Sequence, residues 1–307
     1  MKPFAPRFLS LLGWLLLAWG IALPVAHARE NSTDKPAPIL IKGSDTLTKA
    51  LRELAKAFRE VVPDIGVEVG GGGSGNGIAA LVNGHADIAS SSRLMRSREV
   101  QIAAKKHAGV APVFQVVALD AVSVVVNPAN PLNGISLQQL MEIYGKQEPT
   151  ARWSDLGVQV PGCQDQKILP LSRKNNSGTY AFFRETILPK HDHFDHNLVS
   201  LDASDEIVAM VAQMPCAIGY SGMPYVTGKV KTLCISQSHG PKVPCVPPTV
   251  ASTLNKTYPL SRSLYLYTLG PPSGQSARFL EWIKGPQARE ILQRAGYIPV
   301  PHTDSSP

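Results

Sequence analysis

Residues 171–180 read Leu171-Ser-Arg-Lys-Asn-Asn-Ser-Gly-Thr-Tyr180, and they join two periodic patterns of different kinds. The preceding residues 167–171 form a short apolar run of strand length. The following residues 180–188 carry apolar side chains at the spacing of one helix face. The stretch therefore predicts a strand, a turn and a helix in that order.

This predicted turn carries groups that suit an anion. Ser177 is a candidate N-cap for the helix. The N–H groups of Gly178, Thr179 and Tyr180 would then point out of the helix start, where the helix dipole favours negative charge. Arg173 adds a planar set of donors that fits an oxyanion. An ordinary capped helix with a surface arginine is the alternative interpretation of the stretch taken alone.

Two earlier stretches have the same build. Residues 38–47 pass from an apolar strand pattern into a helix pattern, and residues 67–77 do so through a run of glycines. Glycine allows a ligand to approach the backbone closely, and hydroxyl groups add donors without adding charge. We therefore expect one site built from several helix N-termini. Its candidate residues from these two turns are Ser44, Asp45, Thr46, Leu47 and Ser74.

A third short strand also ends in hydroxyl groups. Residues 86–93 read Ala86-Asp-Ile-Ala-Ser-Ser-Ser-Arg93. Ser92 stands at the end of this strand pattern, and we expect it to form a further edge of the same site.

Strand and helix patterns alternate along most of the chain, which predicts an α/β architecture with mainly parallel sheets. Residues 113–126 are nearly all apolar and are interrupted by Asp120, so they form either two strands or one strand that passes between lobes. Residues 263–269 alternate as a strand and would cross back. Residues 229–235 predict a strand, and residues 236–259 an exposed loop. The expected division is a signal peptide (1–28), a first lobe in two parts (29–118 and 259–307) and a second lobe (119–258).

The N-terminus has the pattern of an exported protein. Lys2 and Arg7 precede an apolar run at residues 8–25, and the small residues of Ala26-His-Ala28 follow. We expect cleavage after Ala28 and a periplasmic location, with a retained membrane helix as the alternative.

Composition favours a soluble globular chain and not a nucleic-acid-binding one. The chain has 307 residues, 44% of them hydrophobic, and a net charge of +7. Cleavage after Ala28 removes Lys2 and Arg7 and leaves 7 − 2 = +5. The charges are scattered, without basic runs or interleaved aromatic residues, so no nucleic-acid partner is expected. The glycine run satisfies the dinucleotide pattern GxGxxG only trivially, and no P-loop pattern occurs.

The four cysteines are an even number in a chain that we expect to be exported. Cys234 and Cys245 would close a short loop, and Cys163 would then pair with Cys216 by elimination. Free thiols or other pairings remain open, because spacing does not determine connectivity.

Together, Gly43-Ser-Asp-Thr-Leu47, Gly73-Ser-Gly75, residues 87–93 and Ser172-Arg-Lys-Asn-Asn-Ser-Gly-Thr179 resemble the periplasmic phosphate-binding proteins of ABC-type phosphate transporters. The similarity covers almost the whole mature chain in order. It implies two α/β lobes of the type II periplasmic-binding-protein fold, joined by two crossing segments, that close over inorganic phosphate. It also implies a membrane permease as partner, no cofactor, no catalytic residues, and a monomer. Carried over by position, the implied phosphate ligands are Thr46, the Leu47 backbone, Ser74, Ser92, Arg173, Ser177, Gly178 and Thr179.

The chain departs from this family pattern in two places. The family often has an aromatic residue at the position of Leu47 and an aspartate at the position of Ser92. The second difference concerns selectivity, because a carboxylate accepts the proton of phosphate and repels sulfate, which has none. Asp45 is the candidate to take over as acceptor; a solvent-facing helix N-cap is the alternative for this residue.

Three classes of function remain: a solute-binding protein for transport, an oxyanion sensor or adaptor, and an exported phosphoester hydrolase. A hydrolase needs a metal cluster or an activated nucleophile, and the site segments contain neither. The segment 191–196, His-Asp-His-Phe-Asp-His, is the sharpest metal-like cluster, and we expect a solvated polar turn there, with metal binding as the alternative. Binding is therefore the preferred class.

Overall fold

The computed structural model describes residues 36–146, 151–190, 192–238, 240 and 243–300. The signal peptide expected at residues 1–28 lies outside the described residues. Ten strands of the described part form one main sheet. They are β1 (Ile39–Gly43), β2 (Val67–Gly72), β3 (Ile88–Ser91), β4 (Pro112–Val126), β6 (Leu169–Arg173), β7 (Val199–Leu201), β8 (Ala217–Gly222), β9 (Lys231–Thr232), β11 (Ser261–Leu269) and β12 (Ile298–Pro299). A separate small sheet pairs β5 (Gly134–Ser136) with β10 (Cys234–Ser236).

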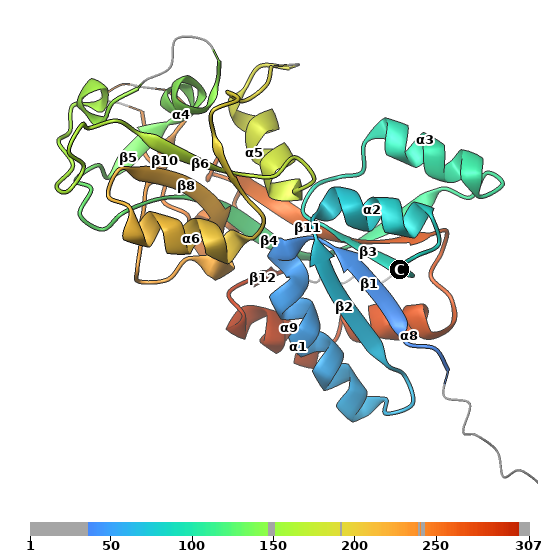
Figure 1. Ribbon diagram of the computed structural model, residues 1–307. Helices are drawn as coiled ribbons and strands as arrows, with labels where there is room; N and C mark the ends of the chain where they lie inside the picture. The colour runs from blue at the N-terminus through green and yellow to red at the C-terminus, as the bar shows by residue number, and fades with distance from the viewer. Residues whose placement is uncertain (1–35, 147–150, 191, 239, 241–242, 301–307) are drawn as a thin grey trace, which may run out of the picture. The chain divides into compact units, whose positions relative to one another are not determined.

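The strand order of the main sheet is β2-β1-β3-β11-β4-β8-β6-β7, with β9 and β12 paired to β4. Two groups of parallel strands stand at its ends, β2-β1-β3 and β8-β6-β7. The central strands β11 and β4 are antiparallel to each other and to their other neighbours. The expectation of mainly parallel sheets therefore holds within each end group and is wrong for the centre. The reason is that one crossing strand leaves the first group and the other returns to it (Figure 1).

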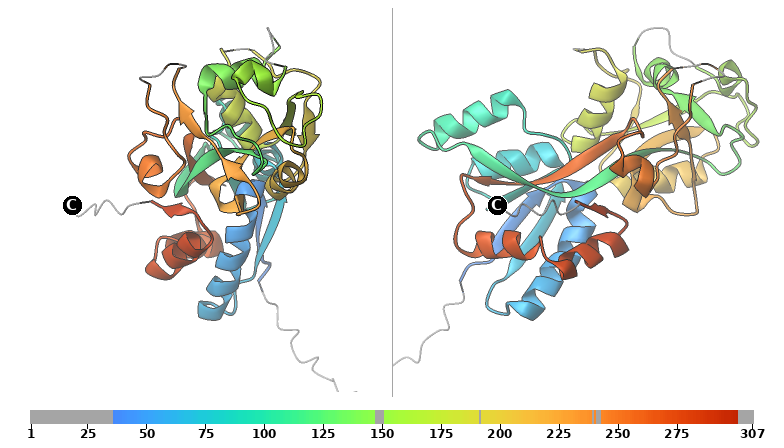
Figure 2. Two further views of the ribbon diagram at one scale, coloured as in Figure 1. Left: turned by 90° about the vertical axis from the view of Figure 1, so that its left-hand side faces the viewer. Right: turned by 180° about the vertical axis from the view of Figure 1, so that it is seen from behind.

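The long apolar run forms a single strand, β4, which resolves the two alternatives that the sequence left open. Residues 112–121 of β4 pair with β11, and residues 122–126 pair with β8. The strand therefore belongs to both ends of the sheet, and it is seen unbroken from behind in Figure 2. We call the part around β1, β2 and β3 the first lobe and the part around β6, β7 and β8 the second lobe.

Helices follow most of the strands. They are α1 (Asp45–Val61), α2 (Ser74–Val82), α3 (Ser97–Lys106), α4 (Leu137–Tyr144), α5 (Gly178–Ile187), α6 (Ser204–Gln213), α7 (Val250–Leu254), α8 (Gly274–Trp282) and α9 (Pro286–Arg294), with the 3₁₀ turns η1 (Trp153–Leu156) and η2 (Met223–Tyr225). Ser136 caps α4, and its Oγ accepts the Gln139 N–H at 3.1 Å. Proline cannot continue a helix, and Pro286 begins a new one, α9.

Helices cover both faces of the sheet in each lobe, as expected for parallel strands with apolar side chains on both faces. In the first lobe, α1, α8 and α9 bury apolar residues on one face, and α2 packs on the other. In the second lobe, α4 and α5 enclose an aromatic core, and α6 packs on the opposite face. Phe58, Leu51, Phe279, Tyr144 and Phe183 are among the fully buried side chains of these layers.

Two predictions for residues 229–259 are wrong. The single strand expected at residues 229–235 is two short strands, β9 and β10, which belong to different sheets. The expected exposed loop contains α7 and the buried Tyr258, whose hydroxyl donates to the Val122 carbonyl at 2.8 Å. A tyrosine that reaches such an acceptor can be buried in a segment rich in proline and serine.

Candidate anion site

The first turn of the site lies between β1 and α1. Ser44 occupies the N-cap position, but its side chain makes no capping bond. Its Oγ is buried, and it has no hydrogen-bond partner among the described residues. Asp45 is the first residue of α1, so the alternative that Asp45 is the N-cap is wrong. Thr46 is buried, and Leu47 donates its N–H to the Ser44 carbonyl at 3.0 Å.

The second and third turns meet within the first lobe. Ser74 begins α2 behind Gly73, whose φ of +92° is a conformation that favours glycine. The Ser74 Oγ accepts the Ser92 N–H at 3.0 Å and lies 3.3 Å from the Ser92 Oγ. Both serines are buried. The two hydroxyls share one hydrogen bond in which either can donate, so one of their two protons is left for another acceptor.

The fourth turn, between β6 and α5, comes from the second lobe. Ser177 is the N-cap of α5, and its Oγ accepts the N–H groups of Thr179 and Tyr180 at 3.2 and 3.3 Å. This confirms the predicted cap. The Ser177 hydroxyl therefore receives two hydrogen bonds and keeps its own proton for another acceptor.

The turns of the two lobes touch each other directly. Thr46 Oγ1 lies 3.0 Å from Thr179 Oγ1. A Cβ added to Gly178 would stand 2.3 Å from Ser74 Oγ and 2.5 Å from Ser92 Oγ, so the glycine backbone lies against both hydroxyls. Hydroxyl groups from four separate segments, three of them helix starts, are therefore gathered in one buried place.

The glycine run of the second turn allows a further contact between the lobes. The carbonyl of Asn176 accepts the Gly75 N–H at 2.9 Å, and its Nδ2 donates to the Gly72 carbonyl at 2.9 Å. A Cβ on Gly73 would stand 2.7 Å from the Asn176 carbonyl oxygen. The glycines thus let two backbones approach each other, and Asn176 is a contact that the sequence analysis missed.

Arg173 is held by both lobes and is almost wholly buried, with its side chain 1% exposed. Its Nη1 donates to Ser204 Oγ at 2.8 Å, and its Nη2 donates to Asp45 Oδ2 at 2.9 Å and to the Asp202 carbonyl. Burial lowers the pKa of Arg173, and the Asp45 carboxylate opposes this shift. The Nε has no partner among the described residues, so it is a donor for a further group.

A second buried ion pair lies at the crossing strands and was not predicted. Arg262 on β11 stands opposite Asp120 on β4, and its Nη2 lies 2.7 Å from Asp120 Oδ2. Arg262 also donates to Thr179 Oγ1 at 3.1 Å and to Thr46 Oγ1 at 3.2 Å. Burial raises the pKa of Asp120, and Arg262 opposes the shift. The signal available in the sequence was Asp120 itself, a single acidic residue within an apolar run, which needs a buried partner.

The formal charges of these two pairs cancel, since Arg173 and Arg262 contribute two positive charges and Asp45 and Asp120 two negative ones. An anion would therefore be held by oriented dipoles and N–H groups and not by an excess of formal charge.

A family model described as the PBP superfamily domain matches residues 26–286 of the chain. The chain belongs to the PBP superfamily. Its α/β fold is the two-lobed type II fold of that superfamily, with the two crossing segments β4 and β11 between the lobes.

Several members of the superfamily are similar over most of their length. The phosphate-binding protein PstS of Pseudomonas aeruginosa is 33% identical over 270 residues, which cover 84% of this chain and 82% of that protein. A solved ABC-type phosphate transport receptor from Vibrio cholerae has a TM-score of 0.68 and 26% identity, covering 86% of this chain and all (100%) of that one. A candidate phosphate ABC transporter substrate-binding protein from Clostridium perfringens, solved with bound phosphate, has a TM-score of 0.75 and 25% identity, with 86% and 100% coverage.

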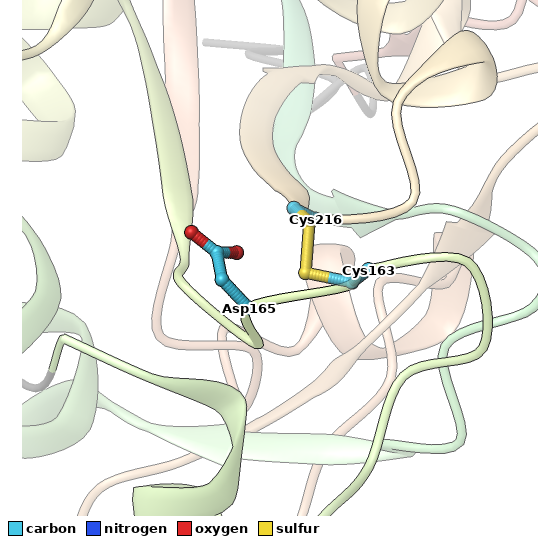
Figure 3. Close-up of side chains that lie close together, drawn as sticks. All are labelled: Cys163, Asp165 and Cys216. Carbon is cyan, nitrogen blue, oxygen red and sulfur yellow. A yellow bond between two sulfur atoms is a disulfide. The ribbon is translucent and has the colours of Figure 1, made fainter.

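The cysteines of this PBP-superfamily chain form two disulfides, both in the second lobe and away from the four turns. Cys163 pairs with Cys216, and Cys234 pairs with Cys245. Asp165 lies beside the first disulfide (Figure 3), but oxidised sulfurs are not the thiolates that bind metals, so this group is no metal site.

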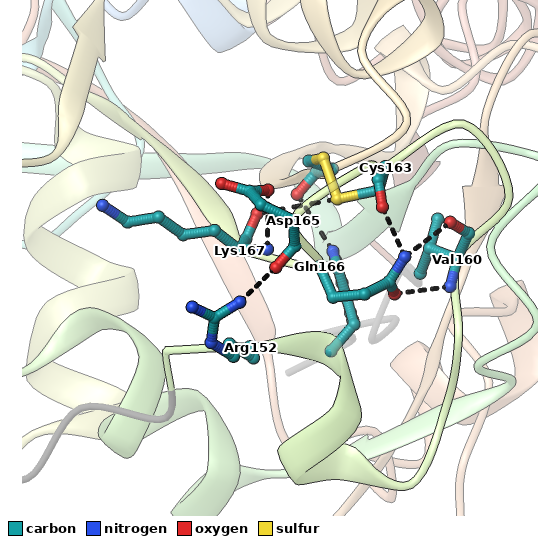
Figure 4. Close-up of a disulfide and its surroundings, with 8 residues drawn as sticks. Arg152, Val160, Cys163, Asp165, Gln166 and Lys167 are labelled. Atoms are coloured by element: carbon teal, nitrogen blue, oxygen red, sulfur yellow. Dashed lines mark hydrogen bonds between the residues drawn. A yellow bond between two sulfur atoms is a disulfide. The ribbon is translucent and has the colours of Figure 1, made fainter.

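The loop that carries Cys163 is fixed by its own hydrogen bonds (Figure 4). The Gln166 side chain accepts the Val160 N–H at 2.7 Å and donates to the carbonyls of Val160 and Cys163. Arg152 donates to the Asp165 carbonyl. These contacts hold Cys163 in place for its partner in the chain before β8.

Removing the Cys163–Cys216 disulfide is expected to lower the free energy of unfolding by about 4 kcal/mol, because it closes a loop of 53 residues. The matched change at Cys234 and Cys245, which are 11 residues apart, should cost about 3 kcal/mol. Guanidinium unfolding of the two double alanine variants measures both values. A larger loss for the shorter loop would contradict the prediction.

Among the described residues 192–196, no three metal-ligating side chains lie close enough together to hold an ion. His193 and His196 lie beside a cavity next to Lys146 and Lys174, and His191 lies outside the described residues.

The described helices include none that is long and apolar enough to span a bilayer.

Proposed function

We propose that this chain is an exported solute-binding protein that holds inorganic phosphate between its lobes and delivers it to the membrane permease of an ABC-type import system. The main support is the meeting of four hydroxyl-rich turns from two lobes beside Arg173. Two buried polar atoms there, Ser44 Oγ and Arg173 Nε, have no partner among the described residues. The relatives named as phosphate-binding proteins support the same ligand.

In this proposal the phosphate ligands are Ser44, Asp45, Thr46, Leu47, Ser74, Ser92, Arg173, Ser177, Gly178 and Thr179. Arg173 is the only cation in direct contact, and the hydroxyl and amide groups supply neutral dipoles. The Leu47 N–H donates to the Ser44 carbonyl in this structure, so its contact with phosphate requires that this donor be shared. The protein acts by binding alone, without turnover, as a monomer and without nucleic acid.

Export and lobe boundaries belong to the same proposal. Residues 1–28 are the signal peptide, and the protein works in the periplasm. The first lobe consists of residues 29–118 and 259–307, and the second of residues 119–258. These limits fall in or beside the crossing strands β4 and β11, where the sheet passes from one lobe to the other.

Calorimetry of ligand-stripped protein from residue 29 onward tests the proposal. Phosphate is expected to bind at one site, and sulfate, molybdate and tungstate more weakly or not at all. Absence of phosphate binding to folded protein would overturn the proposed function. Hydrolysis of a chromogenic phosphomonoester that is abolished by changes at the site would favour the hydrolase instead.

Asp45→Asn is expected to reduce phosphate affinity and to raise sulfate affinity. Asp45 Oδ1 accepts the Gly72 N–H at 2.7 Å and Oδ2 accepts from Arg173, but each oxygen keeps a lone pair for the proton of phosphate. Asp120 is bonded more fully, because its Oδ2 accepts two hydrogen bonds from Arg262 and its Oδ1 accepts the Met223 N–H. An amide at position 45 can donate to sulfate where the carboxylate repels it.

The same calorimetric titrations measure this change. Asp202→Asn is the matched control, since the Asp202 side chain is 66% exposed and pairs with Lys174 at the surface. A phosphate-to-sulfate preference that is the same in Asp45→Asn as in the wild type would show that the acceptor lies elsewhere.

A further inference from the structure

The Arg262 guanidinium uses all its donors on the protein. Its Nε and Nη2 donate to Asp120 Oδ2 at 3.0 and 2.7 Å. Its Nη1 donates to the Ser92 carbonyl at 3.4 Å, and one bond each goes to Thr46 and Thr179. A guanidinium has five N–H groups, and these five hydrogen bonds account for them. Arg262 therefore has no donor left for an anion, unlike Arg173.

Arg262 joins the crossing strands to three of the four turns of the site. Asp120 and Arg262 are opposite each other on the crossing strands, Thr46 and Ser92 belong to the first lobe, and Thr179 to the second. The side chains of the ion pair are 0% and 2% exposed, so solvent does not compete for these bonds. Phe182 covers Arg262 at 5.6 Å from its ring centre, which adds a cation–π contact.

A threonine hydroxyl has one proton and two lone pairs. Arg262 donates to Thr46 Oγ1 and to Thr179 Oγ1, so each oxygen is used as an acceptor on that side. Each hydroxyl proton must then point away from Arg262. In this structure one of the two protons lies between the hydroxyls themselves, which are 3.0 Å apart. A bound anion would offer both protons an acceptor on the side away from Arg262.

We propose that Arg262, fixed by Asp120, is a positioning residue that orients the hydroxyls of Thr46 and Thr179 as donors toward the bound phosphate. This inference rests on the proposed function and adds to it a determinant of affinity that does not touch the ligand. Because Thr179 belongs to the second lobe, the orientation is complete only when the lobes are together. The ion pair thus links the crossing strands to the closed, ligand-binding arrangement.

Two variants test this role by phosphate calorimetry. Asp120→Asn/Arg262→Gln removes one charge of each sign, so the net charge of the site stays constant and no buried charge is left unpaired. Arg262→Lys keeps the ion pair but has three donors in place of five. Both should weaken phosphate binding by about 10- to 100-fold through the lost orientation. Thermal melting shows that each variant is folded, and if the double variant does not fold, Arg262→Lys decides alone.

A double-mutant cycle separates positioning from a general structural effect. In a Thr179→Val background, Arg262→Lys should reduce phosphate affinity by a factor at least about threefold smaller than it does in the wild type. The reason is that one of the two hydroxyls that Arg262 orients is absent. In a Ser74→Ala background the cost should be unchanged, since Ser74 Oγ bonds with Ser92 and not with Arg262.

The results separate this inference from the proposed function. Failure of the wild type to bind phosphate would count against the function itself. If the wild type binds and the folded Arg262 variants bind equally well, Arg262 is not a positioning residue. A penalty of the same size in the Thr179→Val and Ser74→Ala backgrounds would also overturn the inference.

Discussion

Arg173→Ala is expected to weaken phosphate binding by roughly 30- to 5,000-fold, which corresponds to about 2 to 5 kcal/mol for the loss of a buried charged partner. Arg173 is bonded to Ser204 and Asp45 and keeps Nε without a partner among the described residues. Its removal takes away the ligand donor and also leaves Asp45 without its cation. Both changes weaken the binding of an anion.

Titration calorimetry at constant ionic strength measures this loss. Lys174→Ala is the matched control, since it removes one positive charge from the next residue, whose side chain is 52% exposed and pairs with Asp202 at the surface. Exposed pairs of this kind contribute little, so the control should bind nearly as the wild type does. Unchanged affinity in a folded Arg173→Ala protein would remove Arg173 from the site.

Gly178→Ala is expected to weaken phosphate binding by about 5- to 150-fold, which equals the roughly 1 to 3 kcal/mol that overpacking costs. The added Cβ would stand 2.3 Å from Ser74 Oγ and 2.5 Å from Ser92 Oγ, so the lobes could not come together as they do here. Gly178 does not have a positive φ, and alanine is a better helix former than glycine. The second lobe itself should therefore fold normally.

Calorimetry and thermal melting of the ligand-free protein together test this prediction. The affinity should fall while the melting temperature without phosphate stays near that of the wild type. Gly228→Ala is the control, because a Cβ there meets no atom within 4 Å. Wild-type affinity in Gly178→Ala would show that this contact is not part of the ligand-bound arrangement.

Local patterns in the sequence were enough to predict α5 and its Ser177 cap. These features depend on residues close together in the chain, where side-chain spacing and local hydrogen bonds decide the conformation. The same holds for the four hydroxyl-rich turns. Three of them are a strand followed at once by a helix start, the third is a strand end at Ser92, and helix starts favour anions for local reasons.

The pairing of distant segments could not be predicted in this way. The sequence shows Asp120 as an interruption of an apolar run and Arg262 as the residue before an expected strand, 142 positions apart. Only the antiparallel register of β4 and β11 places them opposite each other. Their burial then makes pairing necessary, because an unpaired charge in the interior is costly.

The sequence by itself therefore determined the α/β class, the strand-turn-helix units and the hydroxyl-rich residues at their turns, since all of these follow from local patterns. The tertiary structure alone decided which turns meet, which arginine keeps a free donor and which arginine is fully used by the protein. The physical reason is that hydrogen-bond saturation depends on every neighbour in space. Arg173 and Arg262 look alike in sequence, and only their surroundings leave Arg173 Nε without a partner among the described residues while every Arg262 donor is used.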